Sequence, residues 1–460
     1  MTMNQLESRR RRATAALAVM AALVTVAPAI AQSAQIPAPP QERPVALINA
    51  ALHPVSSESI PRGYLLFEKG RITALGSGDP PALPEQCEVI DAAGRSVYPG
   101  LIAVCTTVGL IETEAVVVTD DRAEYGSFRP EVQALAAVNP DSDLLPVTRA
   151  AGILIAGVFP QGGVIAGRPS VARLDGWTNE SLTIDAAHGV ILNWPITEWV
   201  SAPWLDRPAE DQMRRIAEDH AAIERFFDDA KAALAQRDAD PTRPIDLRFE
   251  AMRPVLEGRE PLFVSASSVG QIEAALTFSK RRGLRLTIVG GAEADKVAAL
   301  LREADVPVIV MGTHRLPTRR SDGYDTPFTL PARLHAAGVR VAIAAGDRPA
   351  HERNLPHHVA TAVAHGLPRD EGIRAITLNA AKVLGIEATH GSLEVGKSAT
   401  LIITRGSALS GDIEGDPLEM TTQIEIAFID GRRIDLGSRH TRLDEKYREK
   451  FRQLGIIEPR

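Results

Sequence analysis

Short apolar runs alternate with helix-like segments through the middle of the chain. Between the runs, apolar residues recur at helical spacing, as at Val297, Leu300, Leu301 and Ala304. This rhythm predicts parallel strands joined by helical crossovers, in either an open α/β sheet or a closed α/β barrel. The runs of strand length are Ile153–Phe159, Pro261–Ala266, Leu284–Val289, Val306–Met311 and Val339–Ala345.

Both ends of the chain carry short strands and tight turns with no helical pattern between them. Within residues 63–76, Lys69-Gly70 separates two strand-like halves, because glycine supplies the left-handed turn position. We therefore expect one small β domain built from both termini, with the α/β region inserted into it. The other strands predicted at the two ends are Val45–Ala51, Glu88–Asp91, Ala399–Thr404 and Gln423–Ile429.

The segment Val97–Gly109 has the pattern of a buried strand at the start of the α/β region. It contains the turn Pro99-Gly100 and ends in the small polar side chains of Cys105, Thr106 and Thr107. Such a strand is expected to deliver these side chains to a pocket.

The composition is that of an ordinary globular protein and does not indicate a particular reaction. The chain has 460 residues, a formal net charge of −7, 45% hydrophobic and 24% charged residues, which argues against nucleic acid as a partner. Its length is ample for a buried core. The only two cysteines are Cys87 and Cys105, so no disulfide framework is expected.

The first residues have the pattern of a secretory signal peptide, which we place at 1–31. A basic stretch at Arg9–Arg12 precedes the apolar run Ala13–Ala27 and the small-residue site Ala29-Ile30-Ala31. The alternative is a retained membrane anchor, for which the apolar run is short and contains Pro28. We expect an exported, most plausibly periplasmic protein that does not interact with the membrane after cleavage, with a Pro-rich linker at 32–44.

Two charged segments stand outside these patterns. Residues 206–260 are charged and helical, and we interpret them as an excursion from the α/β region, either a solvated helix pair or a partner-binding surface. The charged tail at 437–460 is expected to form a surface helix.

Four motifs, in this order along the chain, give it a resemblance to the amidohydrolase superfamily, particularly the imidazolonepropionase-like and prolidase-like branch. They are Pro99–Ile102, Ala337–Val339, Thr377–Gly385 and Gly391–Lys397. The resemblance implies an α/β fold with a (β/α)8 TIM-type barrel at 99–388, inserted into a composite β-sandwich domain formed by 45–98 and 389–436. It also implies hydrolysis of amide or cyclic amide bonds at a metal site on the carboxyl-terminal face of the barrel.

The metal chemistry implied by the resemblance needs particular ligands. Two histidines two residues apart on the first barrel strand project to one face and reach one ion. A carboxylated lysine bridges two ions, a later strand adds histidine, and an aspartate after the eighth strand binds metal and takes the proton from the attacking water.

This sequence has other residues at most of these positions. Cys105 and Thr107 stand where the two histidines belong, and Ser265 replaces a histidine in Phe263–Ala266. None of the lysines, at 69, 231, 280, 296, 382, 397, 446 and 450, closes a strand-like run of the central region. Most of the metal ligands are therefore replaced.

Only the region after the eighth predicted strand keeps a residue of the type that the metal site needs. The resemblance places Asp347 within one residue of the aspartate base, and the alternative role for Asp347 is a helix N-cap or a loop residue facing Arg348. His314 and His351 are the histidines nearest to strand ends, and each is expected to be a loop residue making a hydrogen bond rather than a metal ligand.

Two functions remain open at this point. The first is a non-catalytic or weakly active binding protein for a small amide- or peptide-like molecule, or a partner subunit of an active paralogous amidohydrolase, with no metal cofactor. The second is an active hydrolase of carbon–nitrogen bonds that uses a rebuilt mononuclear site for zinc or another divalent metal.

Overall fold

The computed structural model describes residues 35–201, 207–346, 348–406 and 415–457. The predicted signal peptide at 1–31 lies outside these residues. None of the helices in the described part of the chain combines the length and the apolar composition needed to cross a bilayer.

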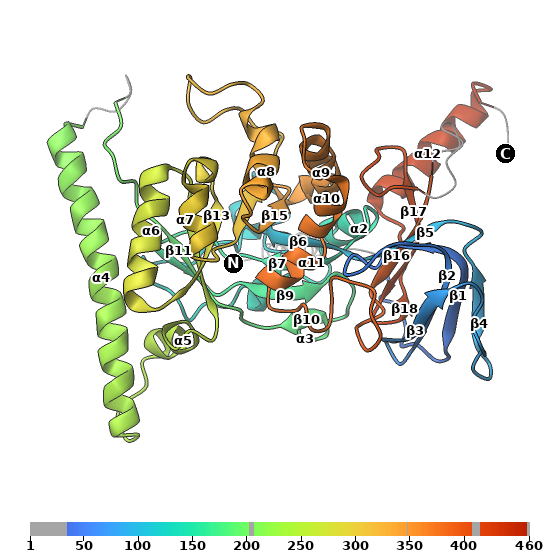
Figure 1. Ribbon diagram of the computed structural model, residues 1–460, viewed down its shortest axis with the longest axis horizontal. Coiled ribbons are helices and arrows are strands. Elements are labelled where there is room, and N and C mark those ends of the chain that lie inside the picture. The colour runs from blue at the N-terminus through green and yellow to red at the C-terminus, as the bar shows by residue number, and fades with distance from the viewer. Residues whose placement is uncertain (1–34, 202–206, 347, 407–414, 458–460) are drawn as a thin grey trace, which may run out of the picture. The chain divides into compact units, whose positions relative to one another are not determined.

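Strands from both ends of the chain form one eight-stranded sheet (Figure 1). Its order is β18-β17-β16-β5-β1-β2-β3, and β4 pairs with β1. The predicted Lys69-Gly70 turn is confirmed, because both residues have positive φ between two antiparallel strands. The sheet is mixed, and its hydrogen bonds define one layer. Its strands are β1 Val45–Leu52, β2 Ile60–Glu68, β3 Arg71–Ser77, β4 Glu88–Asp91, β5 Ser96–Pro99, β16 Leu401–Arg405, β17 Gln423–Ile429 and β18 Arg432–Arg433.

The segment Val97–Gly109 contains the predicted turn Pro99-Gly100, and the buried strand predicted there is Leu101–Thr106. The segment divides into β5, which pairs with β1 and β16, and β6 (Leu101–Thr106), which pairs with β7 in a different sheet. The division falls at Gly100, where a Cβ atom would come within 2.8 Å of the Leu154 side chain. The chain therefore passes from the terminal sheet into the central region through a position that only glycine fills without displacing a neighbour.

The central strands alternate with helices and make the fold a mixed α/β structure. Strands β11 to β15 are parallel neighbours, β6 is parallel to β7, and β15 contacts β6. Two short antiparallel pairings, β7 with β9 and β8 with β11, lie between these groups. The further strands are β7 Ile153–Val158, β8 Ile165–Gly167, β9 Ser170–Arg173, β10 Thr183–Asp185, β11 Val190–Asn193, β12 Pro261–Ala266, β13 Arg285–Gly290, β14 Val308–Met311 and β15 Val341–Ala344.

One buried cluster joins side chains from all the central strands except β10. Ile102, Ile155, Phe263, Ile309 and Ala342 belong to it, together with residues of β8, β9, β11, β13 and α11. The side chains on the opposite faces of the same strands belong to a second cluster shared with the helices. The strands therefore bury both faces, as parallel strands in α/β proteins do.

Helices follow the central strands along the chain (Figure 1). In the predicted excursion, Phe227 of α4 packs edge-on against Phe278 of α6 at 5.0 Å, and Glu224 pairs with Arg282. One face of this helix is therefore held against the α/β region. The helices are α2 Leu144–Arg149, α3 Asn179–Leu182, α4 Ala209–Ala239, α5 Leu247–Leu256, α6 Val269–Arg282, α7 Ala298–Glu303, α8 Thr326–Ala336, α9 Leu355–Ala364, α10 Arg369–Ala375, α11 Leu378–Val383 and α12 Arg439–Gln453, with 3-10 turns η1 Val117–Thr119, η2 Ala134–Ala137, η3 Ala294–Val297 and η4 Pro349–Asn354.

Candidate functional site

The carboxyl end of β6 is the first part of the candidate site. The register between β6 and β7 shifts between Ala103 and Thr106. Because of this irregularity, both Val104 and Cys105 join the inner apolar cluster, although neighbouring residues of a regular strand face opposite ways. Thr107 follows directly and is buried, and its hydroxyl has no hydrogen-bond partner in the described part of the chain.

A carboxyl group that we did not predict lies beside this strand end. Glu352 is in η4, which follows β15 and packs against β6, and the residue is 0% exposed. Neither of its carboxyl oxygens has a hydrogen-bond partner of normal geometry among the described residues. Burial raises the pKa of the Glu352 carboxyl to about 8, although the nearby Thr106 hydroxyl favours the ionised form.

The thiol of Cys105 is the neighbour of this carboxyl group. Burial raises the pKa of Cys105, and the charge of Glu352 raises it further. At neutral pH the strand end therefore presents an uncharged thiol and a mostly protonated carboxyl group.

The carboxyl ends of the other strands carry neutral side chains. Ser265 lies on the same face of β12 as Phe263, which belongs to the inner cluster, and its strand neighbours are Asn193 of β11 and Val289 of β13. On the next pair of strands, Met311 is opposite Ala344. No histidine or carboxylate lies beside Ser265 at these register positions.

The structure brings His314 and His351 near two further histidines, His357 and His358. The rings of His314 and His358 are 4.1 Å apart, and the Nε2 atom of His314 is 2.7 Å from the Thr361 hydroxyl. Burial lowers the pKa of His358 to about 4, and the charges of His314, His357 and His351 lower it further. His351 itself is exposed in η4.

The buried His358 holds the loop after β14 in place. Its Nδ1 atom accepts a hydrogen bond from the backbone N–H of Thr313 at 3.1 Å, so this nitrogen is unprotonated. Its role is therefore structural. The sequence analysis did not predict this contact.

The metal site implied by the resemblance does not fit the residues that the structure describes. Cys105 is a single buried thiol, and hydroxyls such as those of Thr107 and Ser265 are weak ligands for zinc. No three His, Cys, Asp or Glu side chains in the described ranges gather where they could hold one ion. Asp347, the proposed base, lies outside the described residues.

Comparison with known proteins finds a related fold and a family match to part of the chain. The structure is similar to that of an amidohydrolase from Thermotoga maritima, with a TM-score of 0.72 and 22% identity, over 85% of this chain and 99% of the other. The model of the amidohydrolase family matches residues 283–434, from β13 to just beyond β18. Residues 283–434 therefore match the amidohydrolase family, and the described structure has the fold of an amidohydrolase.

Two curated relatives in this superfamily are imidazolonepropionases. That of Flavobacterium psychrophilum is 36% identical over 111 residues, which are 24% of this chain and 26% of that protein. That of Pseudomonas fluorescens is 38% identical over 90 residues, 18% of this chain and 22% of that protein. The matches thus span about a quarter of the length of these relatives.

The sequence match to the family covers only part of the chain. The family match begins at residue 283 and so excludes β6, Cys105 and Thr107. The structure of molinate hydrolase is more distantly similar, with a TM-score of 0.55 and 14% identity over 87% of this chain and 96% of the other. These structural likenesses concern the fold, and the function has to be argued from the site.

Proposed function

We propose that the protein binds a small amide- or peptide-like molecule at the carboxyl ends of its central strands and does not carry out metal-dependent hydrolysis. The observation that carries the proposal is the fully buried Glu352 in η4, which packs against β6 next to Thr106 and within electrostatic range of Cys105. In this superfamily the resemblance assigns metal-binding histidines to that strand end. Neutral groups in their place remove the charge that would hold a divalent ion.

The same groups are suited to binding an amide. A protonated carboxyl group offers one donor and one acceptor, and an amide offers the complementary pair. Thr107 adds a third buried polar group that lacks a partner within the described residues. A ligand that satisfies these atoms recovers the free energy lost when buried polar groups stay unpaired.

The proposed site requires the closed (β/α)8 arrangement that the resemblance implies, and we include that barrel, at 99–388, in the proposal. Its support is the inner cluster that runs through β6, β7, β8, β9 and β11 to β15, and the contact of β15 with β6. We further propose that the sheet formed by both chain ends belongs to a composite β-sandwich domain.

Export to the periplasm, with cleavage after residue 31, completes the proposal, and an active paralogous amidohydrolase is the proposed partner. The support for export is the basic and apolar pattern of Arg9–Ala31. The support for a partner is that a binding subunit without metal ligands needs another chain to supply hydrolysis.

The experiment measures thermal unfolding of the mature protein with two probes, glycyl-L-proline and 2-imidazolidinone, in the presence of either EDTA or zinc. We expect at least one probe to raise the unfolding temperature equally in both conditions, without hydrolysis products. Thr107→Val should reduce the shift, while Thr242→Val, at an exposed position between α4 and α5, should leave it unchanged. Hydrolysis that depends on zinc and stops with EDTA would support the alternative of a rebuilt metal site.

A further inference from the structure

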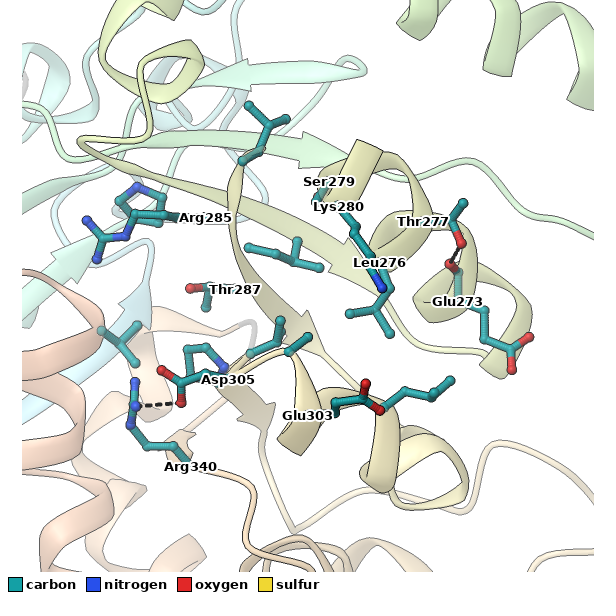
Figure 2. Close-up of a pocket in the computed structure, with 18 of the residues that line it drawn as sticks. Glu273, Leu276, Thr277, Ser279, Lys280, Arg285, Thr287, Glu303, Asp305 and Arg340 are labelled. Carbon is teal, nitrogen blue, oxygen red and sulfur yellow. Dashed lines mark hydrogen bonds and ion pairs between the residues drawn. The ribbon is translucent and has the colours of Figure 1, made fainter. Parts of the chain in front are cut away.

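A cavity of about 840 Å³ lies between α6 and α7 (Figure 2). It is at the amino-terminal ends of the parallel strands, because its lining includes Pro261 and Arg285, the first residues of β12 and β13, and Arg340, which directly precedes β15. Glu352 and Cys105 follow or end their strands at the opposite, carboxyl edge. The cavity is therefore separate from the site proposed above, and it goes beyond the proposed function.

Aliphatic side chains from several elements form much of the cavity wall. They come from α6, α7, α11 and the segments that lead into β13 and β14, and they are Leu276, Leu284, Leu286, Leu300, Val306 and Val383. About half of the lining residues are polar or charged, so the cavity combines an aliphatic wall with polar groups, and its size is that of a small-molecule site.

One buried hydroxyl in the wall lacks a partner. Ser279 of α6 is 2% exposed, and its Oγ atom makes no hydrogen bond within the described ranges. Thr287 of β13 is also buried and adds a second hydroxyl to the lining. Burying an unpaired hydroxyl destabilises a protein, so Ser279 points to a ligand or an ordered water in this cavity.

Four basic side chains and three acidic ones line the cavity, which leaves it a small net positive charge; they are Lys280, Arg285, Arg340 and Lys382, and Glu273, Glu303 and Asp305. Lys280 and Lys382 line it, and neither pairs with an acidic side chain among the residues described. Asp305 is already neutralised by Arg340 at 2.9 Å. In Figure 2 the Lys280 side chain extends into the space between α6 and α7, whereas the carboxylate of Glu273 points away from it.

We infer that this cavity binds a small monocarboxylate with an apolar body. The carboxylate would accept charge-assisted hydrogen bonds from Lys280 and Lys382 and a hydrogen bond from Ser279, while the apolar body covers the leucine side chains. The two features act together, because the aliphatic wall supplies affinity and the lysines select the sign of the head group.

The experiment titrates the mature protein with three probes by calorimetry. Octanoate carries both features, octylamine has the same chain with a cationic head, and acetate has the head group alone. We expect octanoate to bind at one site per chain, with octylamine and acetate at least about tenfold weaker.

Three variants test the residues. Lys280→Met and Lys382→Met keep the aliphatic stem and should each weaken octanoate about fivefold, because a partly exposed charge pair is lost. Lys231→Met, at an exposed position on α4, is the matched control and should bind octanoate like the wild type.

Ser279→Ala gives a readout that a purely structural role would not reproduce. It should raise the unfolding temperature of the free protein, because a buried unpaired hydroxyl is removed, and weaken octanoate binding at the same time. The inference is overturned if octanoate does not bind, if octylamine binds equally well, or if the two lysine variants bind octanoate as tightly as Lys231→Met does.

Discussion

Replacing Glu352 by glutamine is expected to stabilise the protein by about 4 kcal/mol more at pH 8 than at pH 4. The carboxyl group is fully buried, and burial raises its pKa to about 8 from an ordinary value of 4.5. In the wild type the unfolded chain loses this proton first as the pH rises above about 4.5, whereas the folded chain keeps it to about 8. The free energy of unfolding of the wild type therefore has its full contribution from this group at low pH. It falls by about 1.4 kcal/mol per pH unit between about pH 4.5 and pH 8.

The measurement is the free energy of unfolding by urea at several pH values for the wild type and Glu352→Gln. Only the difference between the two proteins matters, because other groups titrate equally in both. Glu303→Gln, at an exposed position on α7, is the control and should follow the wild type. Parallel curves for the wild type and Glu352→Gln would contradict the placement of this carboxyl group.

Replacing Asp175 by asparagine is expected to lower the free energy of unfolding by about 3 to 5 kcal/mol at pH 7. Asp175 is 2% exposed and follows β9. Its carboxylate pairs with Arg149 of α2 at 2.7 Å and Arg432 of β18 at 3.0 Å, and it accepts a hydrogen bond from the backbone N–H of Ala38. Asparagine keeps the shape but leaves two guanidinium groups without their counter-charge, and Arg149 is itself buried.

The Asp175 cluster joins three distant parts of the chain, so its loss should also reduce cooperativity between the terminal sheet and the central strands. Thermal and urea unfolding, followed by circular dichroism, measure both effects. Asp444→Asn, which removes an exposed ion pair with Arg448 on α12, is the control and should change stability by less than about 1 kcal/mol. An equally small effect of Asp175→Asn would show that the buried pairs are not formed.

The sequence patterns predicted much of the fold because local periodicity and burial agree in most elements. Pro261–Ala266 coincides with β12, and Gln423–Ile429 coincides with β17. The four motifs also identified the superfamily, which the family match at residues 283–434 confirms. A closed barrel and a sandwich remain predictions, since periodicity reports which faces are buried but not how the strands close.

The sequence analysis missed features that depend on contacts between distant parts of the chain. The turn Pro99-Gly100 marks the break in the sequence, but the pairing of β5 and β6 with strands of different sheets depends on tertiary contacts such as the close approach of Leu154 to Gly100. Glu352 escaped notice because an acidic residue in a loop is usually solvated, and only the packing of η4 against β6 buries it. Its position in the short segment after the predicted strand Val339–Ala345, next to His351, was the available signal.

At the candidate site, the sequence predicted only the loss of the metal-binding histidines. The replacement of histidines by Cys105 and Thr107 follows from the motif, but the protonated neighbour of Cys105 comes from a distant part of the chain. The cavity between α6 and α7 has no motif at all, because its lysines and leucines lie on separate elements.

The most direct test of the central claim is the zinc content of the mature protein, measured by mass spectrometry after incubation with excess zinc and removal of free metal. The proposal predicts fewer than about 0.1 zinc ions per chain, because the described residues do not gather three side chains of the kinds that hold zinc tightly. One or two zinc ions retained per chain would contradict it and would support a rebuilt hydrolytic centre.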